Sequence, residues 1–421
     1  MRGRFLRRHF FLSIFLFFLN LFNAYALEEC VVCSLKQVEK FCNEVQFDDF
    51  SAYQKKFSKE FVLEKIHRYL QKDPSLENYY MVTEEGLHFF SSPEDKVLGN
   101  SEYTLFFGKD DVCSTVVKSI KEGNKPFEGF RIALDPGHFG GDLAFVEDRF
   151  IDMLPVCEIG EREGIQFNEG TLTLLTAKVL KELLESSGAE VFLTRNSLAK
   201  GAVDLSFDEW LEKVYQKGKK SELDLSSKKK KFRSQYNALD LKVRAQKINA
   251  FQPDVTLFIH YNSHKAEDKE TGKTKVTPEN YNMAFIGGAF MEGELKQKRD
   301  RYEFLRLIVS DDLEKSAILS KFVVEEFQKQ LAVGIIGENK ETSYLEKSCI
   351  QVSEGVFSRN LALTRLVHGV LCYGESLCQN NEQECLRLNN CEVVIDGIKG
   401  PKRVLQVAKA YYNGLLAFYQ K

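Results

Sequence analysis

Four residues of this chain are of types that bind metal ions or move protons, and they stand where such chemistry is commonly placed. His138, His260 and Glu375 each stand at the end of a predicted strand, and Glu169 begins a predicted helix. In open α/β sheets, sites form outside the carboxyl ends of the strands, so these side chains are expected to converge. Each residue taken alone is more often a turn, core or helix-start residue, and long spacings along the chain carry no geometric signal.

These side chains suit metal-assisted hydrolysis. Two histidines, one carboxylate and an open position make the ligand set of a catalytic zinc site. The metal lowers the pKa of a bound water to about 7, and a second carboxylate then accepts the proton as general base. Chemistry of this kind hydrolyses amides.

The elements that must position these side chains alternate between strand and helix. Strands are predicted at 131–134, 190–194, 255–259 and 370–373. Asn168 can cap a helix that Gly188 ends, and further amphipathic helices are predicted around 241–248, 319–331 and 404–418. Apolar strands alternating with such helices predict an α/β fold in which helices cover both faces of the sheet.

The N-terminus predicts an export signal at residues 1–26. Four arginines precede the apolar run 10–22, and Ala24-Tyr25-Ala26 follows as a cleavage site. An uncleaved anchor is the alternative, although the run is short for a bilayer-spanning helix of about 20 residues. We therefore expect an exported protein of the periplasm or cell envelope, or one secreted from the cell, with no stable membrane span after signal removal.

Composition excludes several classes of protein. The 421 residues are 43% hydrophobic and 28% charged, which is enough apolar sequence to bury a large core. Removing the four signal arginines changes the formal net charge from -3 to -7. A mildly acidic mature chain argues against a nucleic-acid partner. All ten cysteines follow the signal, which is compatible with disulfides whose pairing the sequence does not give.

Two regions follow the signal. Residues 27–125 carry no motif with assignable chemistry and predict a small α+β segment with short strands at 79–82, 87–90 and 103–107. Residues 130–421 are predicted to form one catalytic domain with insertions at 196–237, 265–280 and 290–312. We interpret the lysine run 228–231 as a solvated loop.

Four ordered blocks of residues resemble a known family. They are the strand and turn I-A-L-D-P-G-H at 132–138, Glu169 with its helix and the strand ending in Arg195, the stretch from Arg244 to Asn262 that contains I-H-Y-N, and Ser358 to Glu384. Together they are similar to the zinc-dependent N-acetylmuramoyl-L-alanine amidases of the type 3 class, which act on peptidoglycan.

The resemblance implies a role for each matching residue. His138, Glu169 and His260 would bind Zn²⁺, and Glu375 would be the general base. Arg244 and Asn262 would be supporting residues. The implied fold is a single α/β domain with a mostly parallel twisted sheet, and the implied activity cleaves the amide between N-acetylmuramic acid and L-alanine.

Some features depart from the family. The loop between Gly141 and Glu169 is longer than usual and holds rival ligands at Glu147, Glu158, Glu161 and Glu163. We prefer Glu169 because it alone directly precedes the Leu/Ala-rich helix. Residues 290–312 are extra sequence where division amidases of this class hold a self-inhibitory helix. We predict a surface loop there, and leave open a regulatory role and, separately, an activator protein as partner.

Two other functions stay open. One is a non-catalytic cell-wall-binding regulator that keeps the amidase fold, although retention of all four site residues argues against it. The other is a zinc peptidase acting on a different amide, which would share the same metal site.

Overall fold

A computed structural model describes residues 44–109, 118–153, 165–215, 223–264, 274–337 and 343–420. Residues 45–421 belong to one structural unit. The predicted export signal at 1–26 lies outside the described residues, and so do five of the cysteines, Cys30, Cys33, Cys42, Cys113 and Cys157. Four of the described cysteines, Cys349, Cys372, Cys385 and Cys391, are free thiols.

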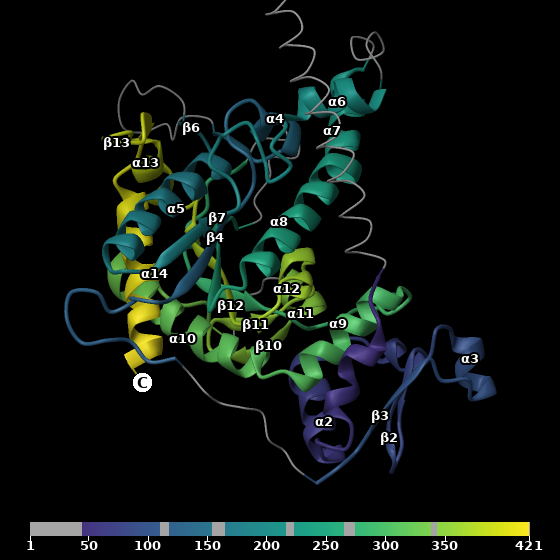
Figure 1. Cartoon of the computed structure of the whole chain (residues 1–421). Helices are drawn as coiled ribbons and strands as arrows, with labels where there is room; N and C mark the ends of the chain where they lie inside the picture. Colours follow the sequence, from purple (N-terminus) through teal and green to yellow (C-terminus); the bar gives the residue numbers. More distant parts are fainter. Residues whose placement is uncertain are drawn as a thin grey trace, which may run out of the picture. The chain divides into compact units, whose positions relative to one another are not determined.

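A seven-stranded sheet with the order β10-β11-β9-β12-β8-β4-β7 forms the centre of the fold (Figure 1). Its strands are β4 (Arg131–Pro136), β7 (Glu190–Leu193), β8 (Val255–Asn262), β9 (Met283–Ile286), β10 (Ile350–Ser353), β11 (Val356–Ser358) and β12 (Leu371–Cys378). The run β12-β8-β4-β7 is parallel, and so is the pair β11-β9. Strand β9 is antiparallel to β12, and β10 is antiparallel to β11. The prediction of a mostly parallel sheet is confirmed.

Helices cover both faces of this sheet. Figure 1 shows α5 (Glu169–Ser186), α10 (Asp312–Leu331) and α14 (Arg403–Gln420) along one face, with α8 (Ala238–Phe251) and α12 (Ala362–Leu366) along the other. Alternation along β4 explains the two layers, because successive strand residues point to opposite faces. Ile132 and Leu134 pack in the main core with Leu172 and Leu175 of α5. Asp135, the residue after Leu134, points to the opposite face and contacts Arg244 of α8.

The start of α5 is fixed by local sequence. Asn168 has an extended backbone, and its side chain accepts a hydrogen bond from the Thr171 backbone N–H at 2.9 Å, which satisfies a free donor of the first turn. The helix ends at Ser186, and Gly188 follows with a φ of 93°. The helix predicted between Asn168 and Gly188 is confirmed, and its cap places Glu169 in the first turn.

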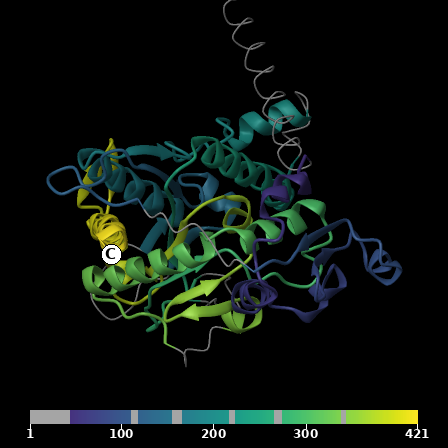
Figure 2. The ribbon, with the colours of Figure 1, turned by 60° about the horizontal axis from the view of Figure 1, so that its bottom comes forward.

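The N-terminal segment contains the three predicted short strands, and the structure shows that they form an antiparallel sheet. Its strands are β1 (Tyr80–Val82), β2 (Gly86–Phe89) and β3 (Tyr103–Phe106), preceded by η1 (Phe47–Tyr53), α2 (Lys59–Lys65), η2 (Ile66–Leu70) and η3 (Pro74–Asn78). Their apolar side chains form a second core with helix α9 (Lys298–Val309). Figure 2 shows the purple and blue N-terminal segment beside the green α9.

The surface loop predicted at 290–312 is wrong. Phe304 of α9 is fully buried, and its ring packs edge-on against Phe89 of the N-terminal sheet. Most charged residues of α9 are paired, for example Arg301 with Glu102 at 2.7 Å and Arg306 with Glu303 at 2.6 Å. This region therefore joins the N-terminal segment to the rest of the unit.

The lysine run lies on a helix and not in a loop. The stretch 196–237 contains α6 (Phe207–Tyr215), α7 (Leu225–Lys231) and η5 (Phe232–Asn237), which continues into α8. Its aromatic side chains pack on Phe139 beside the candidate site. Lys229 of α7 forms an ion pair with Asp148, so this stretch supports the loop after β4.

The remaining elements are short. They are α3 (Pro93–Leu98), α4 (Leu143–Glu147), β5 (Phe150–Met153), β6 (Ile165–Asn168), α11 (Ser343–Ser348), α13 (Glu384–Asn389), β13 (Val393–Ile395) and β14 (Ile398–Gly400). Strands β5 and β6 pair with each other and lead directly into α5, and β13 pairs with β14.

Candidate metal centre

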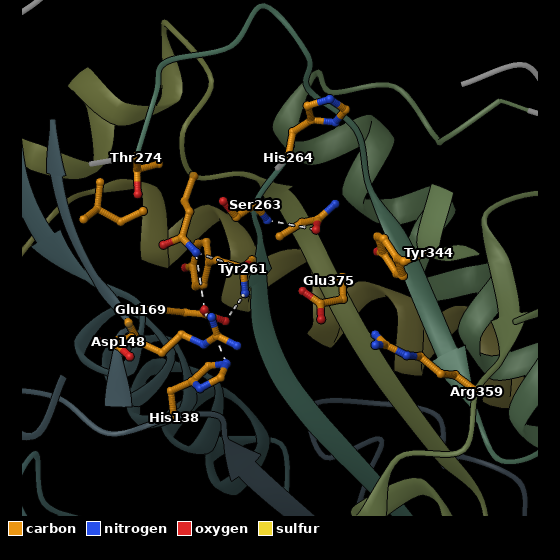
Figure 3. Close-up of a pocket in the computed structure, with 14 residues that line it drawn as sticks. His138, Asp148, Glu169, Tyr261, Ser263, His264, Thr274, Tyr344, Arg359 and Glu375 are labelled. Carbon is orange, nitrogen blue, oxygen red and sulfur yellow. Dashed lines mark hydrogen bonds and ion pairs between the residues drawn. The ribbon is translucent and has the colours of Figure 1, made fainter. Parts of the chain in front are cut away.

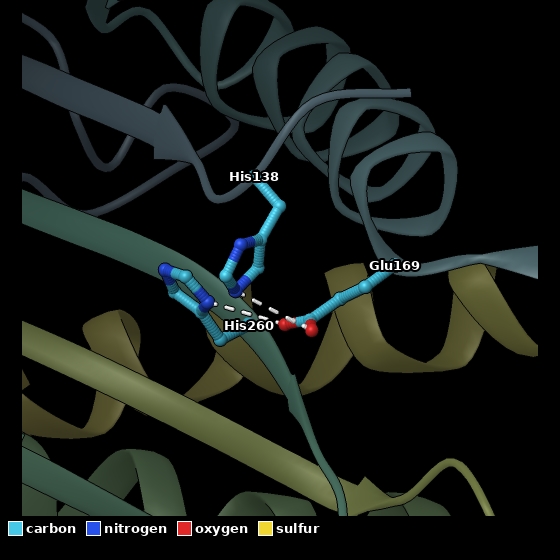
Figure 4. A group of neighbouring side chains, drawn as sticks. All are labelled: His138, Glu169 and His260. Atoms are coloured by element: carbon cyan, nitrogen blue, oxygen red, sulfur yellow. Dashed lines mark hydrogen bonds and ion pairs between the residues drawn. The ribbon is translucent and has the colours of Figure 1, made fainter. Parts of the chain in front are cut away.

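His138, Glu169 and His260 form a cluster of ligand atoms that all lie within 4.8 Å of one another (Figure 4). His138 Nε2 is 3.4 Å from Glu169 Oε2, and His260 Nδ1 is 3.2 Å from Glu169 Oε1. The three residues come from the turn after β4, the first turn of α5 and strand β8. The sequence prediction that they converge is therefore met by the structure.

Glu375 is placed beside this cluster by strand pairing. Strands β12 and β8 are parallel, and Glu375 is the register partner of His260. Register partners on neighbouring strands point to the same face, at the strand spacing of about 4.8 Å. The sequence predicted strands ending before His260 and Glu375, but both strands run through these residues, to Asn262 and Cys378. Their positions within the sheet hold both backbones rigidly.

Two glycines permit the close packing of the turn that carries His138. A Cβ on Gly137 would lie 2.0 Å from the His260 ring, and one on Gly170 would lie 2.0 Å from the carbonyl oxygen of Phe139. Both distances are far below contact, so only glycine fits at either position. His138 itself has a φ of 55°, in the left-handed region.

Glu147, a rival ligand on sequence grounds, lies on the other side of the His138 ring. Its Oε1 accepts a hydrogen bond from His138 Nδ1 at 2.9 Å, and its Oε2 accepts one from the Phe139 N–H at 2.9 Å. With Nδ1 bonded to Glu147, Nε2 is the ring nitrogen that faces Glu169. Glu147 is therefore an orienting residue and not part of the cluster. The other rivals, Glu158, Glu161 and Glu163, lie outside the described residues.

We predict that Glu147→Gln weakens metal binding by about 10- to 100-fold, the usual effect of losing a partner that orients a ligand histidine. The glutamine can keep only one of the two hydrogen bonds, because its amide nitrogen does not accept. Competition with a metallochromic chelator measures the affinity. Glu185→Gln, at the exposed end of α5, is the matched control. An unchanged affinity in Glu147→Gln would show that the orientation of His138 does not depend on this carboxylate.

The charge states of the cluster suit a bound cation. Burial alone would raise the pKa of Glu169. His138 and His260 outweigh burial and lower this pKa to about 2, so Glu169 is a carboxylate. Burial lowers the pKa of His260, which favours the neutral ring that ligates metals. Burial has the same effect on His138, but the carboxylates of Glu169 and Glu147 outweigh it and raise its pKa. A positive charge is thus stabilised at this position.

Glu375 has the opposite environment. Burial and the negative charge of Glu169 raise the pKa of Glu375 to about 8. A carboxyl group in this range can both accept and return a proton near neutral pH.

This shift predicts a pH dependence of stability in metal-free protein. The pKa of Glu375 is higher in the folded protein than in the unfolded chain, so the protonated carboxyl group favours the folded state. This contribution to stability is fully present below the pKa of the unfolded chain and is lost as pH rises toward 8. Glu375→Gln is neutral throughout and lacks this loss. In thermal melts of chelator-treated protein, we expect the Tm of the variant relative to wild type to increase steadily between about pH 5 and 8. A constant difference would contradict the raised pKa.

The cluster opens into a polar cleft of about 350 Å³ (Figure 3). Residues of the cleft that sequence reasoning did not identify as site residues include Tyr344, Arg359 and Gln379. Gln379 Nε2 donates to Glu169 Oε2 at 3.3 Å and helps to hold this carboxylate. Arg359 lay among the motif residues of the fourth resembling block, which was the available signal. Gln379 lay between the motif residues of that block, and Tyr344 lay outside all four blocks.

The two predicted supporting residues occupy different places. Arg244 is buried behind the turn, where it pairs with Asp240 at 2.6 Å and Asp135 at 3.3 Å and donates to the Pro136 carbonyl at 3.0 Å. Its hydrogen bonds and ion pairs hold the turn that carries His138. Asn262 lines the cleft, and its Oδ1 accepts the Ser263 N–H at 2.9 Å.

The fold and site together define an α/β protein with a candidate metal centre in an open cleft. The profile of the Amidase_3 family, described as N-acetylmuramoyl-L-alanine amidase, matches residues 132–351. The chain belongs to this family, which confirms the resemblance seen in the sequence.

Solved structures of amidases are similar to this chain at low sequence identity. The CwlD amidase from Clostridioides difficile, solved in complex with the GerS lipoprotein, is 18% identical with a TM-score of 0.39, covering 69% of this chain and 99% of its own. Ami1 from Mycobacterium abscessus is 15% identical with a TM-score of 0.36 and the same coverage. The catalytic domain of CwlV from Bacillus (Paenibacillus) polymyxa is 13% identical with a TM-score of 0.33, covering 69% and 98%. No curated protein sequence matched.

Proposed function

We propose that this protein is a zinc-dependent hydrolase that cleaves the amide between N-acetylmuramic acid and L-alanine in peptidoglycan. The observation that carries the proposal is the His138–Glu169–His260 cluster, with Glu375 on the neighbouring strand, in a chain of the amidase family. The open cleft suits a polymeric substrate.

The residues present fit a catalytic zinc site. Two imidazoles and one carboxylate are the donor set that such sites use, with a further position left for water or substrate. His138, Glu169 and His260 would hold the ion. When bound, zinc supplies Lewis acidity that polarises the amide carbonyl and lowers the pKa of the attacking water.

Glu375 then performs the proton transfers. Its carboxylate accepts a proton from the water as the oxygen adds to the amide carbon. It returns the proton to the nitrogen as the carbon–nitrogen bond breaks, so the products are the muramic acid carboxyl group and the L-alanine amine. Its raised pKa matches both steps, because a general acid–base works best with a pKa near the working pH. Glu147, Gln379 and Arg244 hold the ligands and the turn in place.

The remaining assignments follow from this function. We propose that 1–26 directs export to the cell envelope, where the family's substrate lies, and that 130–421 is the catalytic domain. Peptidoglycan is the proposed partner. An activator protein is a second proposed partner, and no feature of the described residues supports it separately. Among the described residues, no helix is long and apolar enough to cross a membrane.

Digestion of sacculi tests the proposal. Purified protein lacking 1–26 is incubated with peptidoglycan sacculi, with and without a chelator, and soluble peptides are measured. We expect release that the chelator stops and added zinc restores. Binding to sacculi without release would instead indicate the non-catalytic regulator.

A further inference from the structure

Arg359 lies in the wall of the cleft and points toward Glu375 (Figure 3). It directly follows strand β11, and its backbone N–H donates to the Ile286 carbonyl at 3.0 Å, so its backbone is fixed to the sheet. Its side chain is half-buried. A guanidinium in this position faces any substrate whose amide lies between the metal cluster and Glu375.

Two aromatic rings fix the guanidinium group. Its central carbon lies 5.0 Å from the centroid of the Phe285 ring and 5.1 Å from that of the Tyr344 ring. Stacking of this kind favours arginine, whose planar group is weakly hydrated and keeps its outer N–H donors free for a planar anion. Arg359 is therefore held in place by ring contacts, and within the part of the chain that the structure describes its guanidinium N–H groups have no hydrogen-bond acceptor.

Within the described residues, Arg359 has no carboxylate in ion-pair contact. Other arginines of the unit are paired, such as Arg301 with Glu102 and Arg365 with Asp300. Glu375 interacts with Arg359 through its charge but forms no ion pair with it, so among the described residues the guanidinium is suited to an anion supplied by the substrate. The formal charge of the chain is negative, so this is a local positive site in an acidic protein.

We propose that Arg359 binds a peptide carboxylate of the substrate, close to the scissile amide on the leaving-peptide side, and so selects acidic peptides. This proposal rests on the proposed amidase function. A planar guanidinium can donate two parallel hydrogen bonds to a carboxylate, and this pairing fixes orientation as well as adding affinity. A neutral carboxamide at the same position would lose the charge and one acceptor.

The test compares sacculi whose peptide carboxylates are free with sacculi whose carboxylates are amidated by carbodiimide and ammonia. At low sacculus concentration, where the rate reports kcat/KM, we expect wild type to release peptides from free-carboxylate sacculi about 10- to 100-fold faster, as for a charged hydrogen bond. Arg359→Gln should lose this preference because its rate on the free form falls relative to its rate on the amidated form, and Arg359→Lys should keep part of it. Any effect of the charge of Arg359 on Glu375 acts on both substrates and cancels in the ratio.

Arg131→Gln is the matched control, because Arg131 also stacks on an aromatic ring, at 4.3 Å from Phe251, but begins β4 at the other end of the sheet. It should keep the wild-type preference. Equal wild-type rates on the two forms, or an Arg359→Gln variant that stays folded and retains the preference, would overturn the carboxylate site. Release from neither form would overturn the amidase function instead.

Discussion

Glu375→Gln will slow amide hydrolysis by about 10²- to 10⁴-fold, the usual contribution of a positioned general acid–base. Glutamine has nearly the same shape but cannot accept the proton of the attacking water. Because Glu375 is not among the three proposed ligands, the variant should bind one metal ion per chain as wild type does. Initial rates of peptide release and the metal content of the same preparation measure both effects.

Glu354→Gln is the control for this substitution. Glu354 is an exposed glutamate in the turn between β10 and β11, so its replacement should leave the rate unchanged. If Glu375→Gln hydrolysed sacculi at the wild-type rate, proton transfer would have to come from another group. If it lost both activity and metal, Glu375 would be a ligand rather than the base.

Replacing either proposed ligand histidine should have the second large effect. We expect His138→Ala and His260→Ala each to retain less than a tenth of the metal that wild type holds after dialysis, since a catalytic zinc site has only three protein ligands. Activity should fall in parallel. Elemental analysis of the dialysed protein gives the stoichiometry.

His67→Ala controls for loss of any histidine, because His67 is exposed on the N-terminal segment. It should hold as much metal as wild type. Full metal content in either ligand variant, with the fold intact by circular dichroism, would move the metal site elsewhere.

Much of the fold and of the site was predictable from residue patterns. The strands around His260 and Glu375 are continuous apolar runs, and the cap at Asn168 with the following Leu/Ala helix indicated where Glu169 would lie. The ends of these two strands were predicted too early, because polar residues normally mark the end of a strand. In this sheet the polar residues are built into the strands and form the site.

Other features depend on contacts that local sequence does not contain. Residues 290–312 look like a polar loop because of their charges, yet Arg301 and Arg306 find partners in the fold and the helix buries Phe304. The role of Glu147 depends on the path of the loop after β4, because this path places the Glu147 carboxylate beside Nδ1 of His138. The proposed role of Arg359 likewise could not be predicted from local sequence, because it depends on the sheet that places this residue beside Glu375.

The most direct test of the central claim is the identity of the bond that is cut. Peptides released from sacculi by the metal-loaded protein are labelled at their new amino groups and analysed by mass spectrometry, together with the remaining glycan. We predict L-alanine as the labelled residue, intact glycan chains that carry free muramic acid carboxyl groups, and no products when a chelator is present. New amino groups on any other residue, with muramic acid still joined to alanine, would contradict the assignment and indicate a peptidase.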